Sequence, residues 1–534
     1  MKNLSALLFL FLMSIVSTNL AQEVTADFDL YLEPLRLAPV YDQSTHTYKD
    51  SYVNKTSYDV HLNAFNSTDL LGITPRLKEC RIVKYHWKIT MPNQFAPQVI
   101  EHQYEYESEF PELILQIDPK LESEGIWAPL PDFRRRAGTL PNNDLENVNT
   151  GYTISPGGRN EIGVGENPPA PRKTFGTALP RLGKVYVKLT VTDRSGETAS
   201  TTKTFTLKDK LVVVIGDSFA SGEGNPKRNC PNPDNDWGNP FDNCDVRAYL
   251  LGIKALLNHH RGTVECWEEP HAHRSYNSGS MRAIRDLDQS DPYTTITYLS
   301  FAHTGAKILD GLINPQSGSA LTEIRNRSQI DEIAAAVGDR KIDALIISAG
   351  INDLEFSDVL SKWYMENITE GTIQVREIEA RIDQLSRKYK ALDHKLTQKL
   401  NVKPEDIIIT EYPEDLFSSQ SADGFITTGG CKGFDEYLMY EGILQREALI
   451  LLPLASRLNN EIREASARFG WNYVDGISDA FLGHGYCSSD PYFVSMEESC
   501  NRQADILGTA HPNAKGHEVV KRFVKPKLID VLRN

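Results

Sequence analysis

The pattern of hydrophobic and polar positions changes near residue 209. Before that point, short stretches alternate apolar and polar residues, most clearly at 81–90 and 184–192. Such alternation is typical of strands that bury one face. A turn at 193–196 separates the second stretch from another β-prone run, which ends at Leu207 and predicts a hairpin. This part of the chain is therefore expected to form an antiparallel β domain.

After residue 210, wholly apolar runs alternate with amphipathic ones. The expected strands are 210–215, 294–301, 342–348, 406–410 and 471–474, and the expected helices are 329–337, 376–400, 443–469 with a break at Pro453, and 516–531. Apolar strands separated by helices are typical of a parallel sheet that is covered on both faces. Ligands of such sheets bind at the carboxyl ends of the strands. We therefore expect functional residues in the loops that follow these strands.

The N-terminal residues have the three parts of an export signal. Lys2 supplies the positive charge, Leu7 to Val16 form a short apolar core, and small and polar residues lead to Ala21. Such a core is too short to span a bilayer, and no later stretch is apolar for long enough. The protein is therefore expected to be secreted or periplasmic, with no transmembrane anchor.

Three regions follow from these patterns. They are a signal peptide at 1–21, a β-sandwich domain at 22–208 and an α/β domain at 210–534. Within the β domain, residues 128–173 are rich in Pro, Gly and Asn, which predicts a long loop insertion. The Arg134–Arg136 triplet in this stretch is more often solvated surface than a binding site.

Length and charge exclude some classes of function. A chain of 534 residues is too long for a single core, and its formal net charge is −15. The negative charge argues against nucleic-acid binding and against electrostatic attraction to anionic membranes. It does not exclude a lipid substrate, because an apolar cleft accepts an acyl chain whatever the net charge of the protein. The oligomeric state is unknown from the sequence.

Seven cysteines are present, and disulfide bonds are the expected state in an exported protein. Two short-range pairs would each close a loop, and these are Cys230–Cys244 and Cys487–Cys500. A third pair, Cys266–Cys431, would then remain, with Cys80 free. No spacing of cysteine or histidine is typical of a zinc site, so no metal is expected.

The most informative run is the apolar strand that stops at Gly216, with Ser218 two residues later in a loop of small residues. A serine at the end of a buried strand, beside flexible backbone, is placed like a nucleophile. The same pattern also occurs in ordinary strand-to-loop turns. The Gly-x-Ser-x-Gly elbow does not fit, because Ala220 stands where the second glycine is required.

Three further segments fall at expected loops, namely 300–307, 348–354 and 508–517. Together with Gly216-Asp-Ser218 they resemble, in order, the four sequence blocks of the SGNH (GDSL) hydrolases, and the resemblance spans essentially all of 210–534. The stretches 273–275 and 483–487 are similar to the secreted branch related to the Streptomyces esterase. The resemblance implies a flavodoxin-like, doubly wound parallel sheet. In the β domain, the ending 187–192 and Trp87 resemble PKD-type, immunoglobulin-like domains.

The family resemblance implies roles for four residues. Ser218 matches the nucleophile, and its N–H matches one oxyanion donor. Gly305 matches a second donor through its N–H, Asn352 a third through its side-chain amide, and His511 the general base. Taken singly, each has an ordinary alternative, such as a turn glycine or an Asx-turn asparagine. Their occurrence together and in order favours catalysis.

One position departs from the family pattern. Many members place an aspartate three residues before the histidine, and Gly508 stands there. The branch related to the Streptomyces esterase uses a backbone carbonyl instead, which implies the carbonyl of Gly508. Asp505 is the nearest upstream carboxylate and would serve only if the loop doubled back.

The expected function is that of a secreted carboxylic-ester hydrolase that works through an acyl-serine and needs no cofactor. Its substrate would be a lipid, a short acyl ester or an acetylated glycan. One alternative is a polysaccharide O-acetyl esterase or an acyltransferase that uses the same residues. Another is a non-catalytic binding or adhesion protein.

Overall fold

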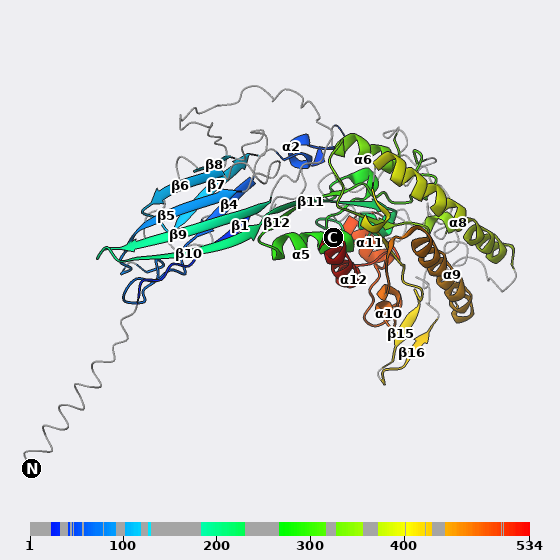
Figure 1. Ribbon diagram of the computed structural model, residues 1–534. Helices are drawn as coiled ribbons and strands as arrows, with labels where there is room; N and C mark the ends of the chain where they lie inside the picture. Colours follow the sequence, from blue (N-terminus) through cyan, green and yellow to red (C-terminus); the bar gives the residue numbers. More distant parts are fainter. Residues whose placement is uncertain are drawn as a thin grey trace, which may run out of the picture. The chain divides into compact units, whose positions relative to one another are not determined.

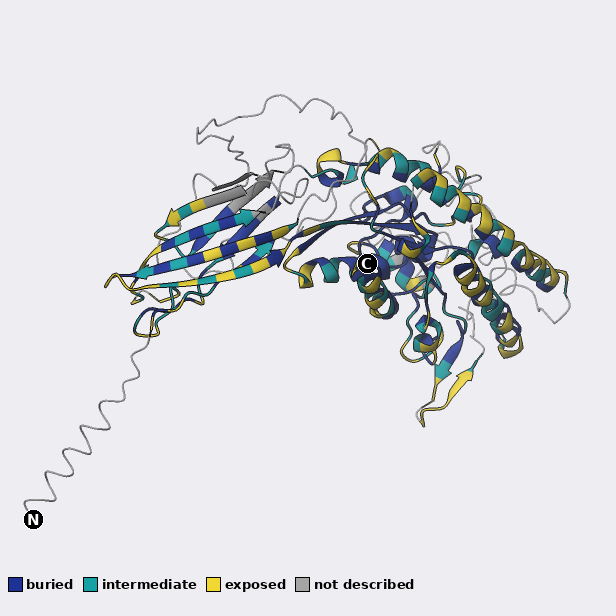
Figure 2. Ribbon diagram, in the orientation of Figure 1, coloured by how far each residue is buried: buried dark blue, intermediate teal, exposed yellow. Residues whose placement is uncertain are grey.

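The structure of the protein is a computed structural model, drawn with its labelled elements in Figure 1. It describes residues 23–32, 41–42, 45, 47–55, 58–77, 79–91, 102–118, 126–129, 183–229, 266–316, 327–355, 372–400, 402–421, 423–429, 444–503, 505 and 507–533. The expected signal peptide at 1–21 and almost all of the expected insertion at 128–173 lie outside these residues. Figure 2 shows how burial is distributed over the described residues.

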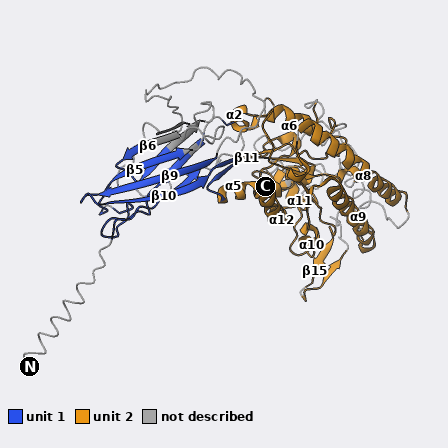
Figure 3. Ribbon diagram, viewed as in Figure 1, with its two compact units in different colours: residues 1–34, 55–209, 291–295 blue, residues 35–54, 210–290, 296–534 orange. Residues whose placement is uncertain are grey.

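The chain divides into two compact units (Figure 3). Unit 1 comprises residues 1–34, 55–209 and 291–295, and unit 2 comprises residues 35–54, 210–290 and 296–534. Each unit has its own large hydrophobic core. The sequence analysis placed 35–54 in the β domain and 291–295 in the α/β domain. The structure assigns 35–54 to unit 2 and 291–295 to unit 1.

Unit 1 is a β domain built from two antiparallel sheets, as predicted. One sheet has the order β1 (Asp29–Leu32), β4 (Tyr58–Asn63), β7 (Glu112–Asp118), β8 (Ile126–Pro129), and the other has the order β10 (Thr198–Thr206), β9 (Lys184–Asp193), β5 (Ile82–Met91), β6 (His102–Ser108). Both sheets contribute to one core, in which Trp87 is fully buried and packs edge-on against Phe28 at 5.3 Å between ring centroids. The PKD type of this domain stays a prediction.

Unit 2 contains the predicted parallel sheet. Its strands lie in the order β12 (Thr294–Ser300), β11 (Lys208–Gly216), β13 (Ala344–Ser348), β14 (Ile407–Thr410), β17 (Asn472–Val474). Numbered along the chain, this spatial order is 2-1-3-4-5, which is the flavodoxin-like order. After β11 the chain adds β12 on one side of it and then β13 on the other side, so the order of the strands reverses between β11 and β13. Folds of this kind bind their ligands at this point.

Helices complete unit 2. They are α2 (Asp50–Val53), α3 (Ser218–Ser221), α5 (Gly279–Ser290), α6 (Gln329–Val337), α8 (Ile373–Leu400), α9 (Gln445–Phe469), α10 (Ile477–Phe481), α11 (Met496–Gln503) and α12 (Ala514–Arg533), with the 3-10 turns η3 (Pro270–Ala272), η4 (Asn352–Leu354) and η5 (Pro404–Asp406) and the short strands β2 (Tyr41–Asp42), β3 (Thr47–Tyr48), β15 (Ser418–Gln420) and β16 (Ile426–Thr428). The long helices pack in two groups, α5 with α12, and α6 with α8 and α9.

The predicted break at Pro453 is wrong, because α9 continues through this proline. A proline inside a helix leaves the carbonyl four residues earlier without its N–H partner. Here both Pro453 and Leu449 are exposed, so water can solvate the free carbonyl. The helix therefore tolerates a residue that the sequence pattern treats as a stop.

The segment 35–54 supports the edge of the sheet in unit 2. The Tyr48 hydroxyl donates to the carbonyl of Ser300 at 2.9 Å and accepts from its N–H at 2.8 Å. The Tyr52 hydroxyl makes the same pair of bonds to Tyr298, at 3.1 and 3.3 Å. Because β12 is an edge strand, these hydroxyls satisfy backbone groups that would otherwise be open to another chain.

Two of the remaining predictions concern cysteines and membrane spans. Cys80 is free, as predicted. Each predicted pairing includes at least one cysteine whose side chain lies outside the described residues, so Cys230–Cys244, Cys266–Cys431 and Cys487–Cys500 stay predictions. Within the described ranges, no helix combines the length and the apolar character needed to cross a bilayer.

Gly216 provides a test of the local fold. Its φ is +139°, and a Cβ at this position would lie 2.1 Å from the carbonyl oxygen of Ser348. We expect Gly216→Ala to lower the free energy of unfolding of unit 2 by about 3 kcal/mol, because the clash is with backbone and adds to the strained φ. Urea denaturation monitored by tryptophan fluorescence measures this loss.

The matched control is Gly470→Ala. Gly470 also has a positive φ, +76°, but a Cβ there makes only an ordinary contact of 3.6 Å with Pro404. A loss of about 1 kcal/mol is expected from backbone strain alone. Equal losses in the two variants would show that the contact with Ser348 is not what requires glycine at 216.

Candidate active site

Ser218 is the first residue of α3, directly beyond the end of β11. Asp217 is the N-cap of this short helix, and its carboxylate accepts the N–H of Phe219 at 3.0 Å. The N–H of Asp217 donates to the carbonyl of Ser348 on β13 at 3.0 Å. Aspartate is a favoured N-cap, and these bonds hold the strand-to-helix turn in place. The turn therefore presents Ser218 at the carboxyl edge of the sheet.

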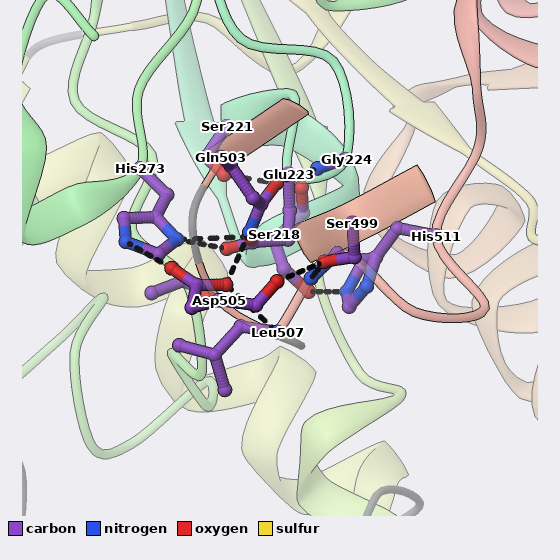
Figure 4. Close-up of polar contacts among 12 residues, drawn as sticks. Ser218, Ser221, Glu223, Gly224, His273, Ser499, Gln503, Asp505, Leu507 and His511 are labelled. Carbon is purple, nitrogen blue, oxygen red and sulfur yellow. Dashed lines mark hydrogen bonds and ion pairs between the residues drawn. The ribbon is translucent and has the colours of Figure 1, made fainter. Parts of the chain in front are cut away.

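His511 lies beside Ser218, as Figure 4 shows. Its Nε2 is 2.7 Å from the Ser218 Oγ, and its Nδ1 is 3.2 Å from the carbonyl oxygen of Thr509. Because a carbonyl can only accept, the Nδ1 carries the proton and the Nε2 is free to accept from the serine hydroxyl. Burial lowers the pKa of His511, so the ring is neutral and able to act as a base at pH 7.

The residues suggested for orienting His511 have other contacts. The carbonyl of Gly508 accepts the backbone N–H of His511 at 3.0 Å, and the carbonyl within hydrogen-bond distance of the ring Nδ1 is that of Thr509, one residue later. Burial lowers the pKa of His511, and hydrogen bonding to both carbonyls raises it by a smaller amount. Ala510, which lies between Thr509 and His511, has a φ of +62° and turns the chain there. The carboxylate of Asp505 is engaged elsewhere, since its Oδ1 accepts the N–H of Leu507 at 2.8 Å.

The residues suggested for the oxyanion hole come from the loops after the next two strands. Asn352 begins η4 after β13 and lines the same pocket as Ser218 and His511. Its amide donates to the carbonyl of Ala306 at 3.1 Å. Gly305, which immediately precedes Ala306, has a φ of +74° and so lies in the region that favours glycine. It is not among the described residues that line the pocket.

The pocket beside Ser218 is mostly apolar, with a volume of about 110 Å³. The loop 412–417 after β14 forms one part of its wall, and apolar side chains from η4, α8 and α9 form another, including Leu354, Ile378, Leu451, Leu454 and Leu458. The sequence analysis did not identify them, because their helical spacing is the same as that of ordinary core residues. Their position against Ser218 is decided only by packing.

Two buried aspartates brace the loops around the site. Asp353 accepts the N–H of Ile308 at 2.9 Å and the ammonium of Lys388 at 2.8 Å, which ties the loops after β12 and β13 together. Asp217 accepts the hydroxyl of Tyr412, and burial raises the pKa of Asp217 to about 7. Both aspartates are structural supports of the pocket.

A second group of buried polar side chains lies near Ser218. Among the described residues, Glu223, His273 and Asp505 are the ones whose atoms could hold a metal ion, since they lie within 4.8 Å of one another. The same atoms already bond to each other and to Gln503. Glu223 and Gln503 were missed by the sequence analysis, since neither carries a spacing that distinguishes it from an ordinary polar residue.

The sequence was compared with protein-family models and with curated protein sequences. A family model described as GDSL-like lipase/acylhydrolase matches residues 212–522. Curated protein sequences gave no significant match.

Several solved structures were also matched, each with low sequence identity. An extracellular lipase from Streptomyces rimosus is 17% identical, with 60% of this chain and 99% of the lipase covered and a TM-score of 0.39. A phospholipase A1 from Streptomyces albidoflavus NA297 is 16% identical, with 60% and 98% covered and a TM-score of 0.36. A family two carbohydrate esterase from Clostridium thermocellum is 11% identical, with 65% and 75% covered and a TM-score of 0.26.

Proposed function

We propose that this protein, which belongs to the GDSL-like lipase/acylhydrolase family and is a carboxylic ester hydrolase, is a secreted enzyme. Its Ser218 forms the acyl intermediate. The observation that carries the proposal is the 2.7 Å contact between His511 Nε2 and Ser218 Oγ at the wall of an apolar pocket. Export is supported by the N-terminal pattern of Lys2 and the apolar run 7–16.

The geometry supports a sequence of proton transfers. His511 Nε2 takes the hydroxyl proton as Ser218 Oγ attacks the ester carbonyl carbon, and the Thr509 carbonyl stays bonded to the Nδ1–H of the imidazolium. His511 then gives its proton to the departing alkoxide, which leaves an acyl-serine. Water, deprotonated by the same ring, attacks that ester, and His511 returns the proton to Ser218 Oγ as the acid is released. In both halves the oxyanion would accept from the N–H of Ser218 and Gly305 and from the amide of Asn352.

The apolar pocket favours substrates with an acyl chain longer than acetyl. Each buried methylene contributes about 0.8 kcal/mol, so we expect kcat/KM to rise roughly fourfold per added methylene until the pocket is filled. Hydrolysis of p-nitrophenyl esters from acetate to decanoate, of phospholipids and of acetylated glycans measures this dependence. No hydrolysis of any ester would overturn the proposed function, and preference for acetylated glycans would favour the O-acetyl esterase alternative.

A pair of variants on α9 ties that preference to the pocket. Leu454 lines the pocket, whereas Leu449 on the same helix is 50% exposed. Leu454→Phe is expected to move the optimum to shorter acyl chains, because the larger ring occupies part of the space. Leu449→Phe is expected to leave the optimum where it is in the wild type. An unchanged optimum in both variants would place the acyl chain elsewhere.

A further inference from the structure

A closed ring of four buried polar side chains lies close to Ser218 and His511. The Nδ1 of His273 is 2.8 Å from both carboxylate oxygens of Glu223, and its Nε2 is 3.6 Å from Asp505 Oδ2. The amide nitrogen of Gln503 closes the ring, at 2.5 Å from Glu223 and 2.6 Å from Asp505 (Figure 4). All four residues are buried.

His273 lies between the two carboxylates of the ring. Its Nδ1 bonds to Glu223, whereas its Nε2 is 3.6 Å from Asp505, an ion-pair distance that is too long for a hydrogen bond. Gln503 donates to one oxygen of each carboxylate, Glu223 Oε1 and Asp505 Oδ1. Trp267 stacks on His273 with 4.7 Å between the ring centroids. Asp505 Oδ2 is buried without a hydrogen-bond partner among the described residues, so the ring is a buried polar network with one unsatisfied oxygen.

Glu223 is joined to the nucleophile and to the histidine loop by short backbone contacts. Its own N–H donates to the carbonyl of Ser218 at 3.1 Å. The next residue, Gly224, donates its N–H to the side chain of Gln503 at 3.1 Å. A Cβ on Gly508 would lie 2.9 Å from the Cα of Gly224, so two glycines allow the loop that carries His511 to pack closely.

Glu223 lies close to His511, because a Cβ on the next residue, Gly224, would be 3.3 Å from the Cβ of His511. Burial lowers the pKa of His511, the negative charge of Glu223 raises it, and the positive charge of His273 lowers it by less. For Glu223 itself, burial would raise the pKa, but the charge of His273 and its hydrogen bond outweigh burial and lower it. Glu223 thus stays ionised at the pH where His511 must accept a proton.

We propose that Glu223 is a positioning residue for His511, and that its buried carboxylate stabilises the imidazolium through space in place of a carboxylate bonded to the ring. The inference rests on the proposed function. It accounts for how a histidine whose Nδ1 partner is the neutral carbonyl of Thr509 is stabilised when it becomes charged. His273 and Gln503 hold Glu223 in place.

Four titratable groups surround His511. Glu223 and His273 act on it directly, and Asp505 acts through its contact with His273. Burial raises the pKa of Asp505, so it is the first carboxylate of the ring to take up a proton as the pH falls. Burial lowers the pKa of His517 to about 3, so His517 stays neutral over the working range.

The test is the pH dependence of kcat/KM for the wild type and for Glu223→Gln. Because only neutral His511 accepts a proton, the acid limb follows the pKa of His511. Loss of the anion is expected to shift that limb to lower pH by roughly half a unit to one unit, and to lower kcat about tenfold with little change in KM. Glu223→Asp, which keeps the charge, is expected to hold the acid limb near its wild-type position.

Glu269→Gln is the matched control. Glu269 is fully buried and its carboxylate is 3.0 Å from the partly exposed His271, so the same change is made in another buried glutamate that is paired with a histidine. Its pH profile is expected to match the wild type. If Glu223→Gln does not fold, Glu223→Gln/His273→Gln removes both charges, and the acid limb is still expected to move down because Glu223 has the larger effect on His511.

The outcomes separate the two proposals. A folded Glu223→Gln enzyme with the wild-type acid limb would overturn this inference, and so would a loss of kcat with no movement of the limb, since that result indicates a purely structural role. A wild-type protein that hydrolyses no ester would instead overturn the proposed function.

Discussion

Replacing Ser218 with alanine is expected to lower kcat for ester hydrolysis by roughly 10⁴-fold or more. The variant loses the atom that the geometry places to form the acyl intermediate, the Oγ at 2.7 Å from His511 Nε2. The remaining rate would come from the pocket and the oxyanion donors alone. Steady-state hydrolysis of the best p-nitrophenyl ester measures the loss.

A covalent probe gives the same test without turnover. A serine-reactive phosphonate is expected to add to the peptide that contains Ser218 in the wild type and to no peptide of Ser218→Ala, as detected by mass spectrometry. Ser221→Ala is the matched control, because Ser221 lies in the same short helix and its hydroxyl donates to the carbonyl of Ser218, at 3.1 Å, rather than to His511. Its kcat is expected to stay within tenfold of the wild type. Hydrolysis that survives Ser218→Ala would contradict the proposed nucleophile.

Replacing His511 with alanine is expected to reduce kcat by a similar factor, roughly 10⁴-fold or more. Without the ring, Ser218 has no base within hydrogen-bond distance, and the leaving alkoxide has no proton donor. Because the two residues act as a unit, the double variant Ser218→Ala/His511→Ala is expected to be about as slow as either single variant. Losses that multiplied in the double variant would show that the residues act independently.

The control for this variant is His394→Ala. His394 is an exposed histidine on α8, so its removal changes the histidine content without touching the site. Its kcat is expected to equal that of the wild type. Thermal denaturation of all variants checks that the losses do not come from unfolding.

The elements of unit 2 were largely predictable because their signals are local. The helix 329–337 was predicted with its observed bounds, since Ser328 caps its start and Gly338 follows its end. Strands such as β13 are buried along their whole length, so their composition alone distinguishes them. The continuation of α9 through Pro453 was not predictable, because it depends on which side of the helix faces water.

The site divides in the same way. Ser218, Asn352 and His511 were identified because the loops that carry them resemble the sequence blocks of a known hydrolase family, and the structure brings these three to one pocket. The carbonyl beside His511 was predicted in kind, but its residue was not, since the turn at Ala510 sets which carbonyl faces the ring.

The sequence by itself determined the alternation of strands and helices and the order of the loops that carry polar residues. Both depend on periodicity or on residues close together in the chain. Ser218 and His511 were proposed as nucleophile and base because these loops resemble those of a known family. Only the tertiary structure decided the apolar wall beside Ser218, the edge support from Tyr48 and Tyr52, and the ring around Glu223. These features join residues as far apart as Glu223 and Gln503, and no local pattern records which distant side chains will meet when the chain packs.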